Sequence, residues 1–193
     1  MTASPPSSRL ARFDALFTEY QRHVLAYAMR RTPTPADAED VAAETFAVAW
    51  RKIDAVPADD PRPWLYAVAR RVLANHRRGT GRRERLAALL RVEDVATPMR
   101  AGEDLDAPAF AALASLSPAD QELLRLLAWE ELGNQGIAAV LGISPNAVAI
   151  RLHRARARFA AAFSREQVKG FAPSRTSGEV KGTHGVAWKG VAK

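Results

Sequence analysis

Apolar residues recur every three or four positions along most of the chain, and this spacing is typical of amphipathic helices. The strict alternation of apolar and polar residues that predicts strands does not occur. In the first half, the pattern predicts helices over residues 10–31 and 35–53, and a third from Pro61 or Pro63 to residue 78. We therefore expect an all-α fold.

Each of these helices has one apolar stripe that can face a common core. We expect that core to contain Phe13, Leu16, Phe17, Tyr20, Val24, Leu25, Tyr27, Val41, Thr45, Phe46, Ala49, Trp50, Ile53, Trp64, Leu65, Val68, Val72 and Leu73. Thr34 is the expected cap of the second helix, and Pro35 suits its first turn, where no backbone N–H is needed.

The second half begins its regular pattern at Phe110. Ser117 and Pro118 mark the start of a helix. Its candidate core side chains are Leu123, Leu124, Leu127 and Trp129. Residues 135–141 then predict a short helix, which Gly142 is suited to end in the left-handed conformation.

A second basic helix follows this turn. Ser144 can cap it, Pro145 suits its first turn, and we expect it to end near Phe163. Its buried stripe is predicted to consist of Val148, Leu152 and Ala155. Two helices joined by a tight glycine-containing turn are typical of a helix-turn-helix, which offers its second helix to the DNA major groove. The alternative is an ordinary pair of helices with solvated arginines.

Glycine and proline divide the chain into segments. Gly79-Thr80-Gly81 is expected to break the third helix, and a Gly/Pro/Asp-bearing stretch follows. We predict two small helical domains joined by a flexible linker. The predicted segments are a disordered N-terminus (1–9), a first domain (10–78), a linker (79–107), a second domain (108–163) and a basic flexible tail (164–193).

Charge favours a polyanionic partner. The 193 residues include 28 Lys+Arg and 21 Asp+Glu, a formal net charge of +7. The absence of cysteine excludes disulfides and thiolate metal sites. Neither a signal peptide nor a membrane-spanning run is apparent, so we expect a soluble cytoplasmic protein without membrane insertion. No metal-binding spacing, phosphate loop or nucleophile motif occurs, so we predict no enzymatic activity, catalytic residues, metal or cofactor.

Three polar surfaces are candidates for binding. The third helix follows two aromatic residues with basic ones, a combination suited to single-stranded DNA: Trp64, Tyr66, Arg70, Arg71, Asn75, Arg77 and Arg78. The alternative is that Trp64 is core and that the arginines are solvated. The second helix has an acidic face, Asp37, Asp40 and Glu44, which suits a basic protein surface or is simply solvated. The helix-turn-helix supplies the third surface.

Two long segments together resemble the extracytoplasmic-function (ECF) sigma factors. The segment from Asp37 to Arg51 resembles the acidic part of sigma region 2, and 63–78 resembles its promoter-melting helix. The stretch from Leu116, with 137–144 and the helix from Val148, resembles sigma region 4. The resemblance covers about residues 10–78 and 108–163, with no intervening region 3.

The resemblance implies partners and roles for particular residues. It implies binding to core RNA polymerase at the β′ clamp helices through Asp37, Asp40, Glu44 and Phe46, and it also implies the β flap as a polymerase contact. It implies contact with the −10 promoter element, a flipped base in loop 54–62 included, through Asp54, Arg62, Trp64, Tyr66, Arg70, Arg71, Asn75, Arg77 and Arg78. It implies contact with the −35 element through Ser144, Asn146, Ala149, Ile150, Arg151, His153 and Arg154. An anti-sigma factor is a further expected partner.

Three positions depart from the family pattern. Arg71 stands where Asn is common, Gly136 where Glu is frequent, and Ala149 where Lys is common. The leading hypothesis is an ECF sigma factor that binds core polymerase, recognises promoters and helps to melt DNA. The alternatives are a stand-alone helix-turn-helix transcriptional regulator and, less favoured, a protein-interaction module that uses the acidic helix and the tail.

Overall fold

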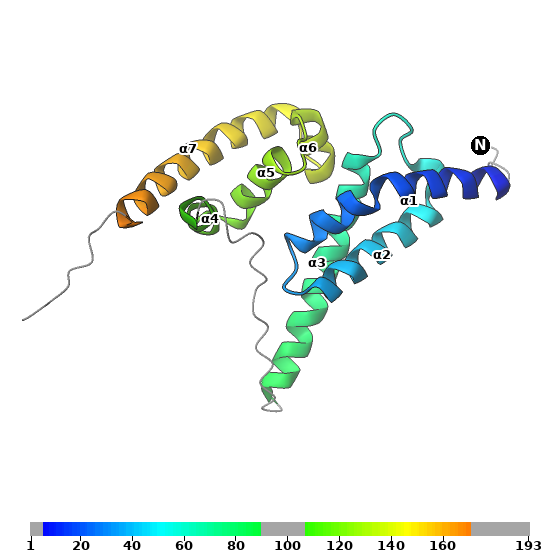
Figure 1. Ribbon diagram of the computed structural model, residues 1–193, viewed down its shortest axis with the longest axis horizontal. Helices are drawn as coiled ribbons and strands as arrows, with labels where there is room; N and C mark the ends of the chain where they lie inside the picture. The colour runs from blue at the N-terminus through cyan, green and yellow to red at the C-terminus, as the bar shows by residue number, and fades with distance from the viewer. Residues whose placement is uncertain (1–5, 90–106, 171–193) are drawn as a thin grey trace, which may run out of the picture.

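The chain folds as two adjoining groups of helices in the computed structural model, which describes residues 6–89 and 107–170 (Figure 1). The elements of the first group are α1 (Pro6–Met29), α2 (Pro35–Arg51), the short 3-10 helix η1 (Ile53–Ala55) and α3 (Arg62–Leu89). Those of the second are α4 (Ala107–Ala114), α5 (Pro118–Ala128), α6 (Asn134–Leu141) and α7 (Pro145–Gly170). No strand occurs in these ranges, and the predicted all-α fold is confirmed.

The first group packs α1 against α2 and α3. Tyr27 and Tyr66 stack in its core with ring centroids 5.0 Å apart, and both side chains are buried. Thr34 caps α2 as predicted: its Oγ1 accepts a hydrogen bond from the Asp37 amide at 3.1 Å and donates one to the Asp37 carboxylate. This cap fixes where α2 begins, and hence which of its faces meets the core.

The second group contains the predicted helix-turn-helix, formed by α6, a tight turn and α7. Gly142 ends α6 with φ of 68°, and the Ser144 hydroxyl accepts a hydrogen bond from the Ala147 amide at 3.2 Å. The predicted stripe of α7 is confirmed, since Val148, Leu152 and Ala155 are all buried. Both α4 and α5 pack against α7 and support it from the other side.

The two groups share one continuous set of buried apolar side chains. At their junction α6 packs against α3. Gly136 brings the two helices close, because a Cβ at this position would lie 3.5 Å from the Pro63 ring and 3.3 Å from Leu132. The glycine that stands in place of the frequent Glu therefore lies where a longer side chain would enter the junction.

Three helices extend further than the sequence pattern predicts. The first, α1, starts at Pro6 rather than residue 10; a proline suits a first helical turn, and Arg9 pairs with Asp54 at 3.5 Å. The third, α3, continues through Gly79 and Gly81, since an interior glycine costs only about 1 kcal/mol of helix stability. The last, α7, runs to Gly170. The remaining predictions for residues 1–5, 90–106 and 171–193 lie outside the described residues.

Three aromatic side chains expected in the core are instead substantially exposed. They are Phe17, Trp50 and Trp129, with 40%, 41% and 38% of their surface exposed. Phe17 and Trp50 lie on the edge of an aromatic cluster around Phe13. Trp129 lies at the junction, where the Arg30 guanidinium is 5.6 Å from its ring centroid. These rings pack on one face only, which apolar spacing along one helix does not reveal.

No single helix among the described residues is long and apolar enough to cross a membrane. By length and composition alone, the pair formed by α6 and α7 passes the same test, with a bend of 101° between its two parts.

Candidate nucleic-acid and protein interfaces

The helix α7 presents a largely polar face with one large apolar residue on it, Ile150. Ile150 is 47% exposed. Val148 and Leu152, two positions before and after it, belong to the buried stripe and are almost fully buried. The other predicted −35 residues are also exposed: Ser144, Asn146, Ala149, Arg151, His153 and Arg154. All the predicted −35 residues are thus exposed, and two of them, Arg151 and Arg154, also line the space between α7 and α3.

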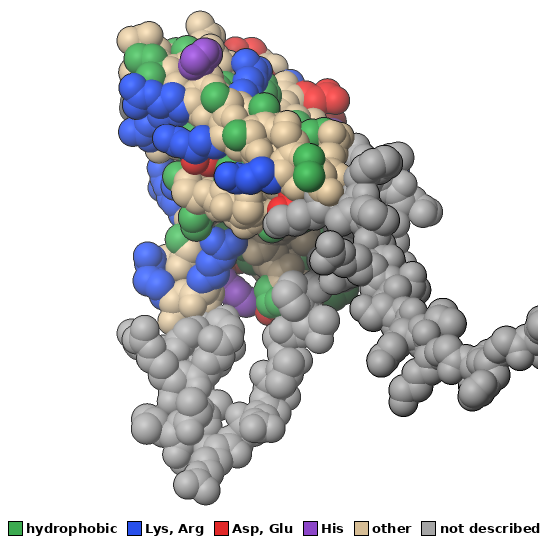
Figure 2. Space-filling model, turned by 90° about the vertical axis from the view of Figure 1, so that its left-hand side faces the viewer, with side chains coloured by type: hydrophobic (Ala, Val, Ile, Leu, Met, Phe, Trp, Pro, Cys, Tyr) green, Lys and Arg blue, Asp and Glu red, His purple; other side chains and the backbone are tan. Residues whose placement is uncertain are grey.

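The basic part of α3 is exposed along its length. The side chains on this surface are Arg70, Arg71, Asn75, Arg77 and Arg78. Arg78 donates a hydrogen bond to the Asn75 amide oxygen, and Arg77 Nη2 donates one to the Arg31 carbonyl at 3.1 Å. On the face drawn in Figure 2, Lys and Arg side chains gather along one side, both on the upper body and on the part of the molecule below it.

The aromatic residues at the start of α3 are less accessible than predicted. Tyr66 is only 2% exposed and stacks on Tyr27, so its ring is not available to a base in this arrangement. Burial raises its pKa to about 12. Trp64 is half-buried and packs against the core. The alternative of a structural role is therefore the better description of Tyr66.

The loop before α3 presents polar groups at the surface. Asp54 is exposed in the middle of η1 and pairs with Arg9, near the start of α1. Asp60 accepts hydrogen bonds from the Arg62 amide at 3.3 Å and from its Nε at 3.1 Å. This ion pair raises the pKa of Arg62 and orders the loop where it joins the basic helix.

The acidic face of α2 is only partly available. Asp40 and Glu44 are exposed. Asp37 is half-buried, since it is engaged with the Thr34 cap and lies 3.6 Å from His76 Nε2. Phe46 is 4% exposed and its ring packs 4.9 Å from that of Phe17. Aromatic residues of α1 cover most of the Phe46 ring, so its burial confirms the expected core position, while its contact with a partner remains a prediction.

A cluster of charged residues joins the two groups of helices, and the sequence analysis missed it. Arg31, at the end of α1, donates to Glu122 at 2.9 Å and to Glu130 at 3.0 Å. Arg30 pairs with the same Glu130 at 2.7 Å, and the Tyr27 hydroxyl donates to Glu122 at 3.0 Å. These five residues, which we term the junction cluster, lie in segments at least 91 positions apart, so no local pattern indicates them.

The junction cluster is buried. The side chains of Arg31 and Glu130 are 2% and 1% exposed. Burial by itself lowers the pKa of Arg31, but the Tyr27 hydroxyl and the carboxylates of Glu122 and Glu130 outweigh this effect and raise it. Burial also raises the pKa of Tyr27. Arg31 is therefore held as a cation between two carboxylates, a geometry that ties the end of α1 to α5.

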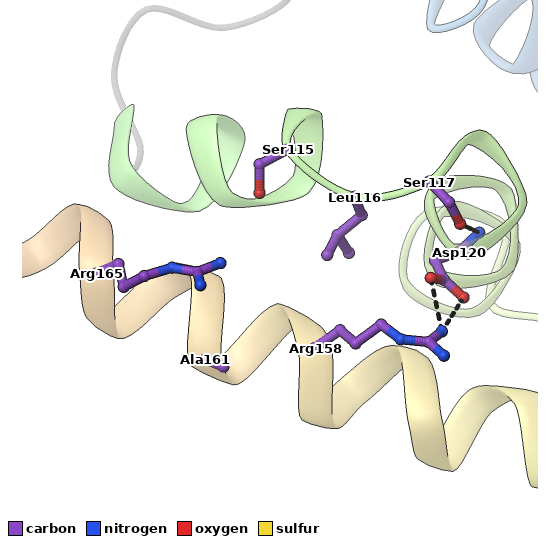
Figure 3. A pocket seen from close by; sticks show the side chains of 7 residues that line it. All are labelled: Ser115, Leu116, Ser117, Asp120, Arg158, Ala161 and Arg165. Carbon is purple, nitrogen blue, oxygen red and sulfur yellow. Dashed lines mark hydrogen bonds and ion pairs between the residues drawn. The ribbon is translucent and has the colours of Figure 1, made fainter.

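A second ion pair orients α7 within its own domain (Figure 3). Asp120, in the first turn of α5, accepts two hydrogen bonds from Arg158 Nη1 at 3.0 and 2.8 Å. Its amide donates to the Ser117 hydroxyl, which caps α5. Asp120, positioned by the Ser117 cap, therefore holds the middle of α7 against α5. Among the described residues, no group of three or more His, Asp or Glu is placed to hold a metal ion.

The helix-turn-helix with an exposed basic recognition helix, joined to a second basic helical domain, defines a class of DNA-binding transcription proteins. Residues 16–83 match sigma-70 region 2, and residues 109–159 match sigma-70, region 4. The chain is 31% identical over 155 residues to the ECF RNA polymerase sigma factor SigL of Mycobacterium tuberculosis, covering 77% of this chain and 87% of that protein. It is 30% identical over 186 residues to the RNA polymerase sigma factor NccH of Alcaligenes xylosoxydans xylosoxydans, covering 87% and 100%. The chain belongs to the ECF sigma factor family.

Solved structures support the fold. The sigma factor RpoE, in complex with the anti-sigma factor NepR from Bartonella quintana, aligns with a TM-score of 0.62 at 23% identity over 79% of this chain and 96% of that chain. CnrH in complex with the cytosolic domain of CnrY aligns with a TM-score of 0.55 at 24% identity over 79% and 88%. The expected family and fold are confirmed, whereas the individual contact residues remain predictions.

Proposed function

We propose that this chain directs core RNA polymerase to promoters and assists DNA melting, and that the polymerase performs all the chemistry. In this proposal the chain is not itself an enzyme, and it acts in the cytoplasm with the polymerase. The observation that carries the proposal is that one chain holds both an exposed groove-reading helix, α7, and an exposed arginine-rich helix, α3, next to an ordered acidic loop. A stand-alone regulator needs only the first of these.

We propose that residues 10–78 bind the polymerase and the −10 element and that residues 108–163 bind the −35 element. Asp40 and Glu44 are the candidate contacts with the β′ clamp helices because they are exposed and lack ion pairs among the described residues. Asp37 contributes mainly through the Thr34 cap. An anti-sigma factor is the second proposed protein partner, and the β flap is the proposed polymerase contact of the second domain.

We propose that strand contacts near the −10 element come from Asp54, Arg62, Arg70, Arg71, Asn75, Arg77 and Arg78. Arginines supply phosphate contacts, and a base taken out of the stack costs a few kcal/mol that such contacts offset. Trp64 is the remaining aromatic candidate in this set, because Tyr66 is enclosed by the core.

We propose that α7 reads the −35 element with its first three turns. Asn146 can pair with adenine, Arg151 and Arg154 with guanine, and Ile150 can contact a thymine methyl group. Ala149 has no group for a phosphate contact, which leaves the backbone amides at the start of α7 as the nearer donors. The exposure of Ile150 on an otherwise polar surface supports base contact.

Binding to core RNA polymerase tests the proposal. The double variant Asp40→Asn plus Glu44→Gln is expected to weaken binding to core enzyme, measured with the full chain by fluorescence anisotropy. Glu39→Gln is the matched control, since Glu39 is an exposed carboxylate on another face of α2. Equal affinities of the two variants would rule out the α2 interface, and no affinity of the unmodified chain would favour the stand-alone regulator.

A further inference from the structure

A groove of about 860 Å³ runs between the two domains, and eight of the 19 residues that line it are arginines. One wall is formed by α3, with Arg70, Arg71 and Arg77. The opposite wall is formed by α5 and α7, with Arg125, Arg151 and Arg154. Since the walls come from different domains, the groove exists only while the domains stay packed together.

The positive charge in the groove is not balanced by its carboxylates. Asp120 lines the groove but is already paired with Arg158, and Glu122 with Arg31. Among the described residues, the six arginines named above make no ion pair with a carboxylate, whereas Arg158, which also lines the groove, is paired with Asp120. Six like charges around one small space repel one another unless an anion enters it.

Two arginines that line the groove also have buried donors without acceptors. Nη2 of Arg31 and Nε of Arg125 are buried and make no hydrogen bond. Arg125 is half-buried, and burial together with the nearby charge of Arg31 lowers its pKa. Leaving a buried polar donor unsatisfied costs about 1–3 kcal/mol, more when the group is charged. An acceptor-rich ligand in the groove would relieve the repulsion among the guanidinium groups, whereas these two nitrogens have almost no accessible surface and are not themselves open to it.

The size of the groove selects the kind of anion. Pockets for small molecules have volumes of about 300–1,000 Å³, and this groove falls in that range. A duplex is too large to enter it, because a B-DNA duplex is wide enough for its major groove alone to admit a whole α-helix. A carboxylate peptide offers one charge per side chain, whereas a chain of phosphates offers several charges and many acceptor oxygens in a short length. Guanidinium groups match phosphate oxygens in pairs.

We propose that the interdomain groove binds a small anion with two or more linked phosphates, such as an inorganic polyphosphate or the phosphate chain of a nucleotide. The ligand bridges α3 to α5 and α7. This goes beyond the proposed function but rests on it in one respect: Arg70, Arg71, Arg77, Arg151 and Arg154 are also the proposed DNA contacts. A ligand bound in the groove therefore prevents these arginines from contacting a promoter. It also stabilises the packed arrangement of the two domains.

Calorimetric titration of the full chain tests this proposal without polymerase or promoter. The probes are inorganic tripolyphosphate and guanosine 5′-triphosphate, with sulfate at matched ionic strength as the reference for adventitious anion binding. We expect tripolyphosphate to bind with a stoichiometry of one and far more tightly than sulfate. If the nucleotide binds more tightly than tripolyphosphate, the ligand is a nucleotide. If the two probes bind equally, the groove recognises only the phosphate chain, and the ligand is an inorganic polyphosphate.

Arg125→Gln is expected to weaken tripolyphosphate binding about tenfold or more, since a charged hydrogen bond is lost. Arg156→Gln is the matched control, because Arg156 is exposed on α7 and does not line the groove. Arg71→Gln, at an exposed position, gives a second test if Arg125→Gln misfolds. Equal affinity of Arg71→Gln and Arg156→Gln, or binding no tighter than sulfate, would overturn the proposal. Either result would leave polymerase binding through α2 unaffected, so the two proposals fail separately.

Discussion

Arg31 and Glu130 form an ion pair at 3.0 Å between the end of α1 and the end of α5, with both side chains almost fully buried. The pair joins the domain that matches sigma-70 region 2 to the one that matches region 4. Arg30, the residue directly after α1, pairs with the same carboxylate. Because charges buried without partners are costly, this geometry makes the packing of the two domains depend on a few side chains.

We predict that Glu130→Ala destabilises the chain by about 3–5 kcal/mol, because it leaves the buried Arg31 with one carboxylate instead of two. Urea unfolding of the full chain measures the change. Asp14→Ala, which removes an exposed carboxylate from α1, is the control and should change the stability by about 0.5 kcal/mol or less.

The same variant should let the domains separate. Small-angle X-ray scattering of Glu130→Ala is expected to give a larger radius of gyration than that of the unmodified chain. An unchanged radius together with the predicted loss of stability would mean that the cluster stabilises the fold without controlling the domain arrangement.

Gly142→Ala should destabilise the helix-turn-helix by about 1–2 kcal/mol, because a residue with a Cβ is strained at a φ of 68°. A Cβ at Gly142 would meet no atom within 4 Å, so the effect isolates the backbone conformation. Gly133→Ala is the matched control: it has equal space around it and a φ of −70°. Thermal unfolding measures the stability of both variants. An equal loss of stability in the two would contradict the assignment of the strain to Gly142.

We predict that Arg154→Ala weakens promoter binding by the polymerase-bound chain by about 1–3 kcal/mol if Arg154 pairs with a base, and by less if it contacts only phosphate. Binding to a promoter duplex and to a scrambled duplex of equal length distinguishes the two cases. Arg156→Ala controls for the lost charge. Equal losses on both duplexes would exclude base reading by Arg154.

Alkaline titration tests the buried tyrosine stack. Burial raises the pKa of Tyr27 and Tyr66, the latter to about 12, above the ordinary value near 10. A raised pKa means that the neutral phenol contributes stability that is fully present below about pH 10 and is lost as pH rises through the folded-state pKa. Ultraviolet difference spectra should therefore show these two phenols ionising late and together with unfolding. Ionisation of all three tyrosines near pH 10 in the folded chain would contradict their burial.

Local features could be predicted from the sequence, and features that depend on distant partners could not. The Thr34 cap, the left-handed Gly142 and the stripe of α7 each follow from a few adjacent residues. The continuation of α3 past Gly79 was missed because a modest glycine penalty does not overcome a favourable helix on both sides. The order of the predicted helices along the chain also did not indicate that α6 packs against α3.

The candidate site residues also divide into those whose exposure follows from local spacing and those whose burial depends on distant partners. Exposure of the polar face of α7 was predictable from its apolar stripe. The burial of Tyr66 was not, since it depends on the Tyr27 ring of α1 that packs on it. Phe46 was expected both in the core and at a partner surface, and it is buried. The junction cluster could not be predicted from the sequence either, because Arg31 and Glu130 are 99 positions apart and each resembles an ordinary surface residue.

Run-off transcription with core RNA polymerase tests the central claim most directly. Core enzyme with the full chain should initiate at defined sites on some genomic promoter fragments, and core enzyme alone should not. Products should disappear with Asp40→Asn plus Glu44→Gln and persist with Glu39→Gln. The absence of any chain-dependent start site across a genomic fragment library would contradict the account.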